Sequence, residues 1–227
     1  MIIFLFIIGL CFGSFLNVLI WRLNNKNVPK FWQGRSICPK CRHILSWADN
    51  IPLLSFIFLR GKCRYCKKPI SWQYPVVEII TAVLFLLIGF HPVIWAIGSV
   101  FIVIFFSDLI YGFIPDEMII VGVILSIPGN LLVAAGTALP FFIFSKLKMM
   151  GEGDIGLAFL MGLLLGWPKV GVALWSGFIV GGLTAIILIL LKKTKISATI
   201  PLGPFLILGI IIAVLWSDKI FKIIGFG

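Results

Sequence analysis

The chain has 227 residues, of which 61% are hydrophobic and 12% charged, and its mean hydropathy is +1.16. These values exclude a soluble globular domain and predict a polytopic membrane protein. The formal net charge of +11 needs no nucleic-acid partner to explain it, because a basic rim beside anionic membrane lipid suffices.

The first apolar run, residues 1–21, is long enough to cross a bilayer by itself, and no basic residue precedes it. We therefore expect it to remain as the first transmembrane helix and not to be cleaved as a signal peptide. The fold expected is an all-α integral membrane protein with about eight transmembrane helices, with tight turns near 89–92 and 129–130. The later spans are predicted at about 74–90, 91–107, 114–130, 131–147, 154–167, 169–191 and 200–217.

Loop charges orient these spans, since Lys and Arg residues in short loops stay on the cytoplasmic side. If the N-terminus lies outside, nearly all Lys and Arg residues fall inside, and only Lys169, Lys219 and Lys222 fall outside. The opposite orientation would invert that ratio. The sequence therefore predicts an external N-terminus and a cytoplasmic loop over residues 22–73.

This loop is the only stretch able to form a small water-facing subdomain, and it holds two CxxC pairs. Cys38 pairs with Cys41, and Cys63 pairs with Cys66. Two such knuckles at this separation are typical of a zinc-ribbon-like, four-thiolate site, in which the metal replaces a core that so short a segment cannot build. Disulfides or free thiols are the alternatives, and a reducing cytoplasm disfavours disulfides. Four protein ligands leave no open position, so the zinc is expected to be structural.

Acidic residues are rare in this chain, and a carboxylate at membrane depth is a candidate functional group. Asp108 ends the third predicted span and Asp154 begins the sixth, so both carboxylates are expected at the same depth on the same side. Two aspartates that meet in a low-dielectric site share a proton, which is the arrangement of aspartic proteolysis. Gly151 and Gly153 would let a substrate backbone approach closely and let the chain turn into the helix that opens at Asp154.

Other acids have simpler explanations. Asp116 and Glu117 occupy positions typical of helix-capping acids, Glu152 is expected to face water, and Glu78 is either a first-turn acid or a site residue. Two other functions stay open on the residues alone. A transporter would relay a cation at a broken helix, and a non-enzymatic assembly factor would dock partners through the basic zinc loop.

Seven motifs follow one another in an order that resembles one known family. They are FGSFLNVLIWRL, GRSICPKC, WADNIPLLSFIFLRGKCRYC, SWQYPVVEIITA, DLIYGFIPD, GEGDIGLAFLMGLLLG and PLGPFLILG. The chain resembles the type IV prepilin peptidases, which are bifunctional leader peptidases and N-methyltransferases of type IV pilus and type II secretion systems. By this resemblance the two catalytic aspartates fall on Asp108 and on Asp154, the latter within the GxGD signature. Relatives commonly carry Lys where this chain has Gly156.

The resemblance implies an enzyme of the bacterial inner membrane that cuts prepilin and pseudopilin precursors after a Gly on the cytoplasmic side. It also implies transfer of a methyl group from S-adenosylmethionine to the new N-terminal residue. No Gly-rich nucleotide-binding turn with an acidic ribose partner appears in the sequence, so methylation is implied by the resemblance alone. The domains expected are a first transmembrane helix (1–21), a four-cysteine zinc domain (22–73) and a seven-helix peptidase core (74–227).

Overall fold

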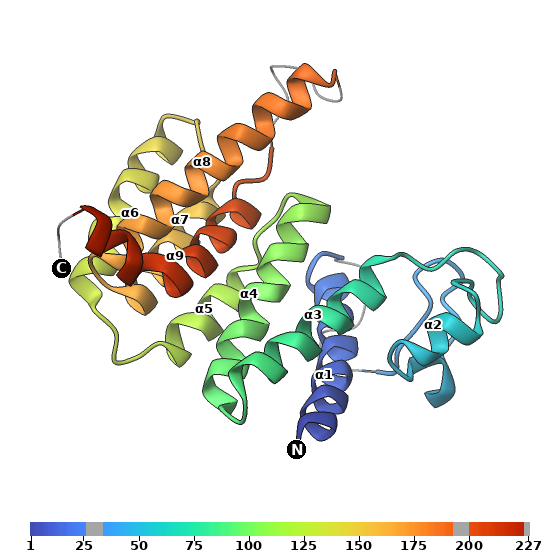
Figure 1. The fold of residues 1–227 in the computed structure, drawn as a ribbon. Coiled ribbons are helices and arrows are strands. Elements are labelled where there is room, and N and C mark those ends of the chain that lie inside the picture. Colours follow the sequence, from blue (N-terminus) through green and yellow to red (C-terminus); the bar gives the residue numbers. More distant parts are fainter. Residues whose placement is uncertain (26–33, 193–199, 225–227) are drawn as a thin grey trace. The chain divides into compact units, whose positions relative to one another are not determined.

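The computed structural model describes residues 1–25, 34–192 and 200–224, with the side chains described up to residue 217. Within these ranges the regular structure is helical, and two isolated β-bridges are the only β-pairing (Figure 1). The predicted all-α fold is therefore confirmed. The contacts divide the chain into two compact units, Met1–Val103 and Ile104–Gly227. The predicted domain boundaries at 21 and 73 stay a prediction.

In the first unit, α1 (Ile2–Leu23) and α3 (Gln73–Ile88) pack backbone against backbone in opposite directions. Two glycines make this possible. A Cβ added at Gly9 would lie 2.5 Å from the Cα of Ala82, and one added at Gly13 would lie 2.6 Å from the Cα of Glu78. Small residues four apart are a common device for close helix contact in membranes.

The turn after α3 confirms the tight connection expected near 89–92. Gly89 adopts φ +72°, which glycine reaches without steric cost, and α4 (Pro92–Tyr111) begins three residues later. The indole N–H of Trp95 donates to the carbonyl oxygen of Gly89 at 2.7 Å, and the ring of Trp95 stacks on Phe85 at 4.3 Å. These contacts fix the first turn of α4 against α3.

The chain between α1 and α3 forms the four-cysteine domain, whose described part contains the 3₁₀ helix η1 (Trp47–Asn50) and the short helix α2 (Leu54–Phe58).

The second unit contains the end of α4 and five further helices, which pack largely in sequential pairs. Gly162 lets α6 and α7 approach, since a Cβ there would lie 2.7 Å from the Cα of Ala134. Gly177 does the same for α8 and α9, where a Cβ would lie 3.2 Å from the Cα of Leu206. The helices are α5 (Asp116–Leu125), α6 (Leu131–Lys146), α7 (Glu152–Leu165), α8 (Lys169–Leu190) and α9 (Gly203–Ile224).

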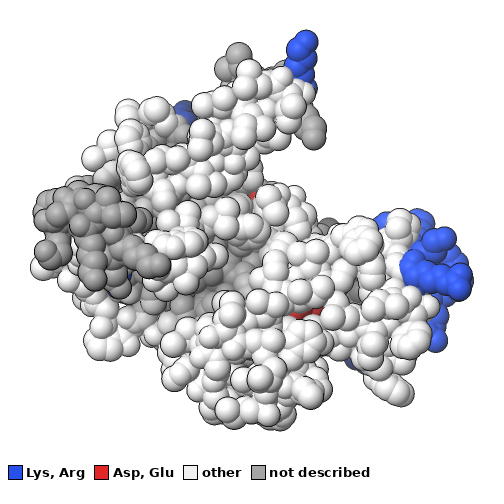
Figure 2. Space-filling view, viewed as in Figure 1, with Lys and Arg blue, Asp and Glu red and all other residues white. Residues whose placement is uncertain are grey.

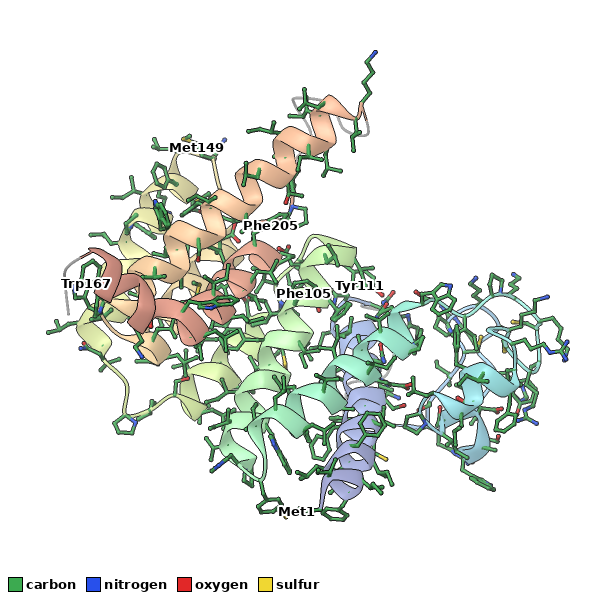
Figure 3. All side chains as sticks on the ribbon, viewed as in Figure 1. Met1, Phe105, Tyr111, Met149, Trp167 and Phe205 are labelled. Carbon is green, nitrogen blue, oxygen red and sulfur yellow. The ribbon has the colours of Figure 1, made fainter. Side chains whose placement is uncertain are left out.

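Helix length and outward apolar surface identify a multi-pass membrane protein. Within the described ranges, α1, α4 and α8 are long and apolar enough to cross a bilayer, and α3, α6 and the described part of α9 are shorter apolar helices. Large apolar side chains point outward, as Met149 and Trp167 do at the turns flanking α7 (Figure 3). Such a surface is anomalous in water and natural in lipid.

One predicted span is corrected. The apolar stretch 114–130 contains only the ten-residue helix α5, which is about 15 Å long and half the thickness of the hydrocarbon core. The helix ends at Leu125 because Pro128 follows closely and disfavours helical backbone at the residue before it. Asn130 then caps α6, its side-chain oxygen accepting from the N–H of Val133 at 3.2 Å.

Candidate active site and metal centre

Asp108 lies three residues before the end of α4, and its side chain is buried. Its carboxylate oxygen Oδ2 accepts a hydrogen bond of 2.8 Å from the backbone N–H of Gly203, the first residue of α9. An N–H group at a helix start has no partner within the helix, so it is available to hold a carboxylate. The start of α9 thereby fixes the position of Asp108.

Asp154 is the third residue of α7 and is partly buried. Its carboxylate accepts a hydrogen bond from the backbone N–H of Gly151, the N-cap residue, so it does cap its own helix. The negative charge of Asp108 also acts on it. The two carboxylates thus lie close enough to repel each other when both are ionised.

Ile114 connects the parts of this site. A Cβ added at Gly153 would lie 2.9 Å from the Cβ of Ile114, and one added at Gly203 would lie 3.4 Å from its Cδ1. The turn between α4 and α5, the start of α7 and the start of α9 therefore converge around one buried side chain. Gly203 was missed as a site residue by sequence reasoning, although it lies in the PLGPFLILG motif.

Gly156 faces α5. A Cβ there would lie 3.1 Å from the Cγ2 of Ile119. The space that a longer side chain would need is taken by α5, so Ile119 would have to move to accommodate it.

The remaining acids divide into two groups. Asp116, Glu117 and Glu152 are exposed in the first turns of α5 and α7, where acids favour the helix dipole. Glu78 is buried, and its Oε2 accepts a hydrogen bond of 2.8 Å from the backbone N–H of Leu53. Glu78 therefore holds the loop between α1 and α3, and it is not a first-turn acid, because it lies beyond the first turn of α3.

The four cysteines of the loop form one cluster. The sulfur atoms of Cys38, Cys41, Cys63 and Cys66 lie within 4.8 Å of one another, and none is in a disulfide. Neighbouring sulfurs of a tetrahedral zinc site are about 3.8 Å apart, since each Zn–S bond is about 2.3 Å. The cluster therefore fits a bound metal ion such as zinc.

The two CxxC pairs adopt the same local structure. Ile37 bridges to Ile44 around the first pair, and Lys62 bridges to Pro69 around the second. The N–H of Arg42 donates to the carbonyl of Cys38 at 2.8 Å, and that of Lys67 donates to the carbonyl of Cys63 at 3.0 Å. Arg42 and Lys67 both have positive φ, +57° and +58°. The second knuckle thus repeats the first, and each presents two sulfurs to the same point.

The protonation chemistry of these thiols also fits a cation. Burial raises the pKa of the Cys63 thiol, but hydrogen bonds from the backbone of Cys66 and Tyr65 outweigh it and lower that pKa to about 7. At Cys41 a backbone hydrogen bond from His43 acts to lower the pKa, yet desolvation and the neighbouring thiols raise it to about 11. Thiols this close oppose one another's ionisation, and a divalent cation would relieve that repulsion.

Asp49, which lies in η1, connects this 3₁₀ helix to the second knuckle. Its Oδ1 accepts from the Nε of Arg64 at 2.7 Å, and its Oδ2 accepts from the hydroxyl of Ser46 at 2.8 Å. Burial raises the pKa of Asp49, but these hydrogen bonds outweigh that effect and hold the pKa below its usual range. The ring of His43 packs against that of Tyr65 in a tilted arrangement, with ring centres 3.7 Å apart, and His43 is not a member of the cysteine cluster.

The surface of this domain is strongly basic. Figure 2 shows its Lys and Arg side chains gathered at one edge, away from the apolar helices of the same unit. The exposed basic residues are Arg35, Lys40, Arg42, Arg60, Lys62, Arg64, Lys67 and Lys68.

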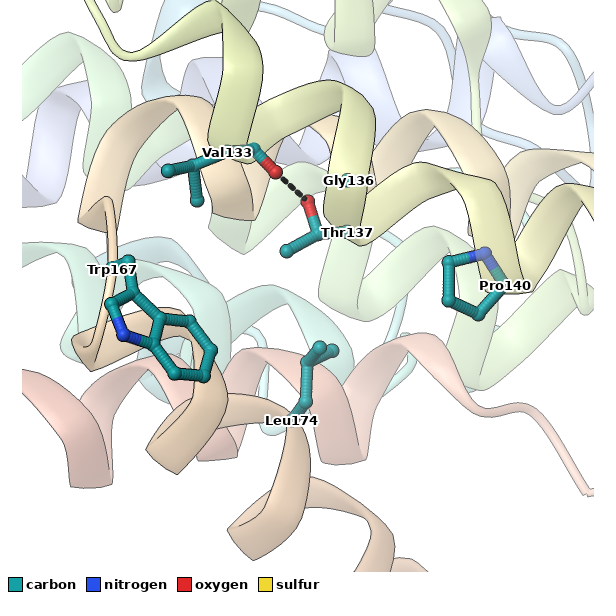
Figure 4. Close-up of a pocket in the computed structure, with 6 residues that line it drawn as sticks. All are labelled: Val133, Gly136, Thr137, Pro140, Trp167 and Leu174. Carbon is teal, nitrogen blue, oxygen red and sulfur yellow. Dashed lines mark hydrogen bonds between the residues drawn. The ribbon is translucent and has the colours of Figure 1, made fainter.

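A pocket in the second unit lies apart from both aspartates. The hydroxyl of Thr137 is engaged there with the carbonyl oxygen of Val133 at 3.0 Å (Figure 4). Among the residues that the structure describes, no charged side chain lines this pocket, so it offers an apolar surface and no reacting group. Its lining residues are Val133, Gly136, Thr137, Pro140, Trp167 and Leu174.

These features define a multi-pass membrane protein that carries an acid pair in one unit and a four-cysteine domain in the other. Residues 7–91 match the model of the Bacterial Peptidase A24 N-terminal domain family. No solved structure matches the chain.

Curated relatives cover nearly the whole chain. A prepilin leader peptidase/N-methyltransferase of Aeromonas hydrophila is 31% identical over 263 residues, covering 95% of this chain and 90% of the relative. A protein of the same name from Legionella pneumophila is 30% identical, and the match covers 93% of this chain and 90% of the relative. One from Myxococcus xanthus is 34% identical, and the match covers 79% of this chain and 62% of the relative. The chain belongs to the prepilin leader peptidase/N-methyltransferase family.

Proposed function

We propose that this protein cleaves the leader peptide of type IV prepilins and pseudopilins and then N-methylates the new N-terminal residue. The carrying observation is the buried Asp108, held by the N–H of Gly203 and close enough to Asp154 for their charges to interact. Such a pair suits acid–base hydrolysis of a peptide. The names of the relatives support the same two activities.

In this mechanism Asp108 and Asp154 hold a water molecule between them. One carboxylate takes a proton from the water as its oxygen attacks the carbonyl carbon of the Gly at the cleavage site. The other carboxyl gives a proton to the amide nitrogen as the C–N bond breaks, which leaves a free amine on the mature pilin. The pair titrates as a unit, so acid and base are not assigned to single residues.

Backbone N–H groups orient both carboxylates for this work. The N–H of Gly203 holds Asp108, and the N–H of Gly151 holds Asp154. Gly151 has no side chain, so a substrate backbone can approach at that point. These hydrogen bonds occupy part of each carboxylate and leave lone pairs for the water.

The distribution of Lys and Arg residues supports a site on the cytoplasmic side. An external N-terminus puts the basic four-cysteine domain, and with it the site of Asp108 and Asp154, in the cytoplasm of a bacterial cell. Zinc in that domain would have a structural role, because four thiolates leave no open coordination position.

S-adenosylmethionine supplies the methyl group in the second reaction. The apolar pocket of the second unit does not fit it, because no charged side chain lines the pocket and the Thr137 hydroxyl is already engaged. No residue is therefore assigned to the methyl donor.

The test is intact-mass spectrometry of a prepilin incubated in lipid with this protein, with and without S-adenosylmethionine. We expect loss of the leader in both reactions and the gain of one methyl group only with the methyl donor. Asp154→Asn should abolish leader loss, while Asp116→Asn, which changes an exposed acid, should retain it. Ion flux without cleavage would favour a transporter, and no cleavage of any precursor would favour an assembly factor.

A further inference from the structure

Helix α2 exposes an apolar face that no other described residue of its unit covers. Leu54, Ile57 and Phe58 are 51%, 66% and 81% exposed. These three positions share one side of a helix, because they are three and four residues apart. Phe56 points elsewhere and packs on Trp72 with ring centres 5.1 Å apart. The exposed face therefore belongs to an ordered element and not to a loose end.

The start of α2 lies beside α1 and α3, within their length and not beyond their ends. Glu78, which binds the N–H of Leu53, lies about 8 Å along α3 from its first residue, Gln73. Glu78 also accepts a hydrogen bond from Ser14. Ser14 lies about 13 Å along α1 before its last residue, Leu23. These contacts hold the Pro52–Leu53 turn beside the two helices, about two turns in from the end of each.

The backbone at this turn is strained. Leu53 has φ +57° and ψ −48°, and the N–H of Leu54 donates to the carbonyl oxygen of Pro52 at 2.6 Å. This is a γ-turn of the rare form, centred on a residue with a bulky side chain. The Glu78 hydrogen bond to Leu53 holds the turn in place, so the depth of α2 is set by a specific contact.

The charged residues beside α2 favour one partner for this face. Arg60 and Lys62 follow α2 directly and are exposed. Over residues 34–72 the only acid is Asp49, and it is engaged with Arg64. An apolar face at membrane depth, next to unbalanced basic residues, is the pattern of an element that lies in the interface of an anionic bilayer.

We propose that α2 is an interfacial helix whose face of Leu54, Ile57 and Phe58 inserts among the acyl chains beside α1 and α3, with Arg60 and Lys62 at anionic headgroups. The four-cysteine domain is then anchored to the membrane at a third point, besides α1 and α3. This goes beyond the proposed catalytic function and does not depend on it.

The test uses the full-length protein in nanodiscs of anionic lipid, with trifluoromethylphenylalanine replacing Phe58. Fluorine relaxation is measured with oxygen, which concentrates in lipid, and with a water-soluble gadolinium chelate. Phe15 on α1, 52% exposed, is the lipid reference, and Ile44 in the first knuckle, 53% exposed, is the water reference. Retained metal content shows that each labelled protein is folded.

We expect the fluorine relaxation rate at position 58 to resemble that at position 15, with a large increase from oxygen and a small increase from the chelate. Arg60→Gln with Lys62→Gln should raise the chelate effect at position 58 in anionic nanodiscs. Relaxation like that of position 44 would overturn the proposal. Protection from both probes would also overturn it, because protein and not lipid would then cover the face.

Discussion

At the scale of single residues, the hydrogen bond from Gly203 to Asp108 joins groups 95 residues apart in the sequence. The sequence predicted Asp108 and Asp154 because carboxylates are rare in apolar runs. It could not predict Gly203, since a glycine carries no chemistry that reveals a role in a site. Only the meeting of α4 with the start of α9 gives that backbone N–H its role.

We predict that Gly203→Ala lowers leader cleavage by about 100-fold, a typical cost of displacing a reacting group by about an ångström. A Cβ at this position would lie 2.7 Å from the Oδ2 of Asp108, so the carboxylate must shift. Single-turnover cleavage of a prepilin measures the effect. Gly182→Ala is the matched control, since nothing lies within 4 Å of its added Cβ. Equal rates for the two variants would show that this contact does not position Asp108.

At the scale of elements, the positions of the apolar helices were largely predictable, but their lengths were not. Hydropathy predicts a membrane span over 114–130, because the stretch is apolar. Its helix is only Asp116–Leu125, because Pro115 lies at its start and Pro128 follows its end. The cysteine domain was the easiest element to predict, because two CxxC pairs allow few other structures. The close pairing of α1 with α3 also has a sequence signal, Gly9 and Gly13, which hydropathy alone does not reveal.

We predict that Gly13→Ala destabilises the α1–α3 pair by about 1–3 kcal/mol, the usual cost of overpacking a tight contact. The added Cβ would meet the backbone of Glu78, which cannot move unless the helices separate. Thermal unfolding in detergent measures the change, and Gly136→Ala on α6, with open space at its Cβ, is the control. Similar melting temperatures for both variants would contradict the close packing of α1 against α3 at Gly13.

The four-cysteine domain should bind one zinc ion per chain. Cys63→Ser should lose that metal, because it removes one of the four ligands, while the helical content is retained since the membrane helices do not depend on it. Metal analysis by mass spectrometry and far-ultraviolet circular dichroism measure the two quantities. Reduced wild-type protein without zinc, or a Cys63→Ser variant with full zinc, would contradict the metal assignment.

At the scale of the whole molecule, two kinds of chemistry lie in separate contact units. The cysteine cluster belongs to Met1–Val103, and the acid pair belongs to Ile104–Gly227. The family-domain match at residues 7–91 lies within the first unit, while the relatives extend over both. The sequence alone predicts a chemistry for each set of residues. It could not show that backbone N–H groups at two helix starts hold the two carboxylates, because that depends on the packed structure.

We propose that Asp108 and Asp154 act as one unit in leader cleavage. The most direct measurement is the single-turnover cleavage rate of a prepilin by Asp108→Asn, by Asp154→Asn and by the double variant. We predict that each single variant loses about 100-fold or more, and that the double variant is no slower than either, because residues that work together lose their effect together. A single variant that cleaves at the wild-type rate, or losses that simply multiply in the double variant, would contradict the account.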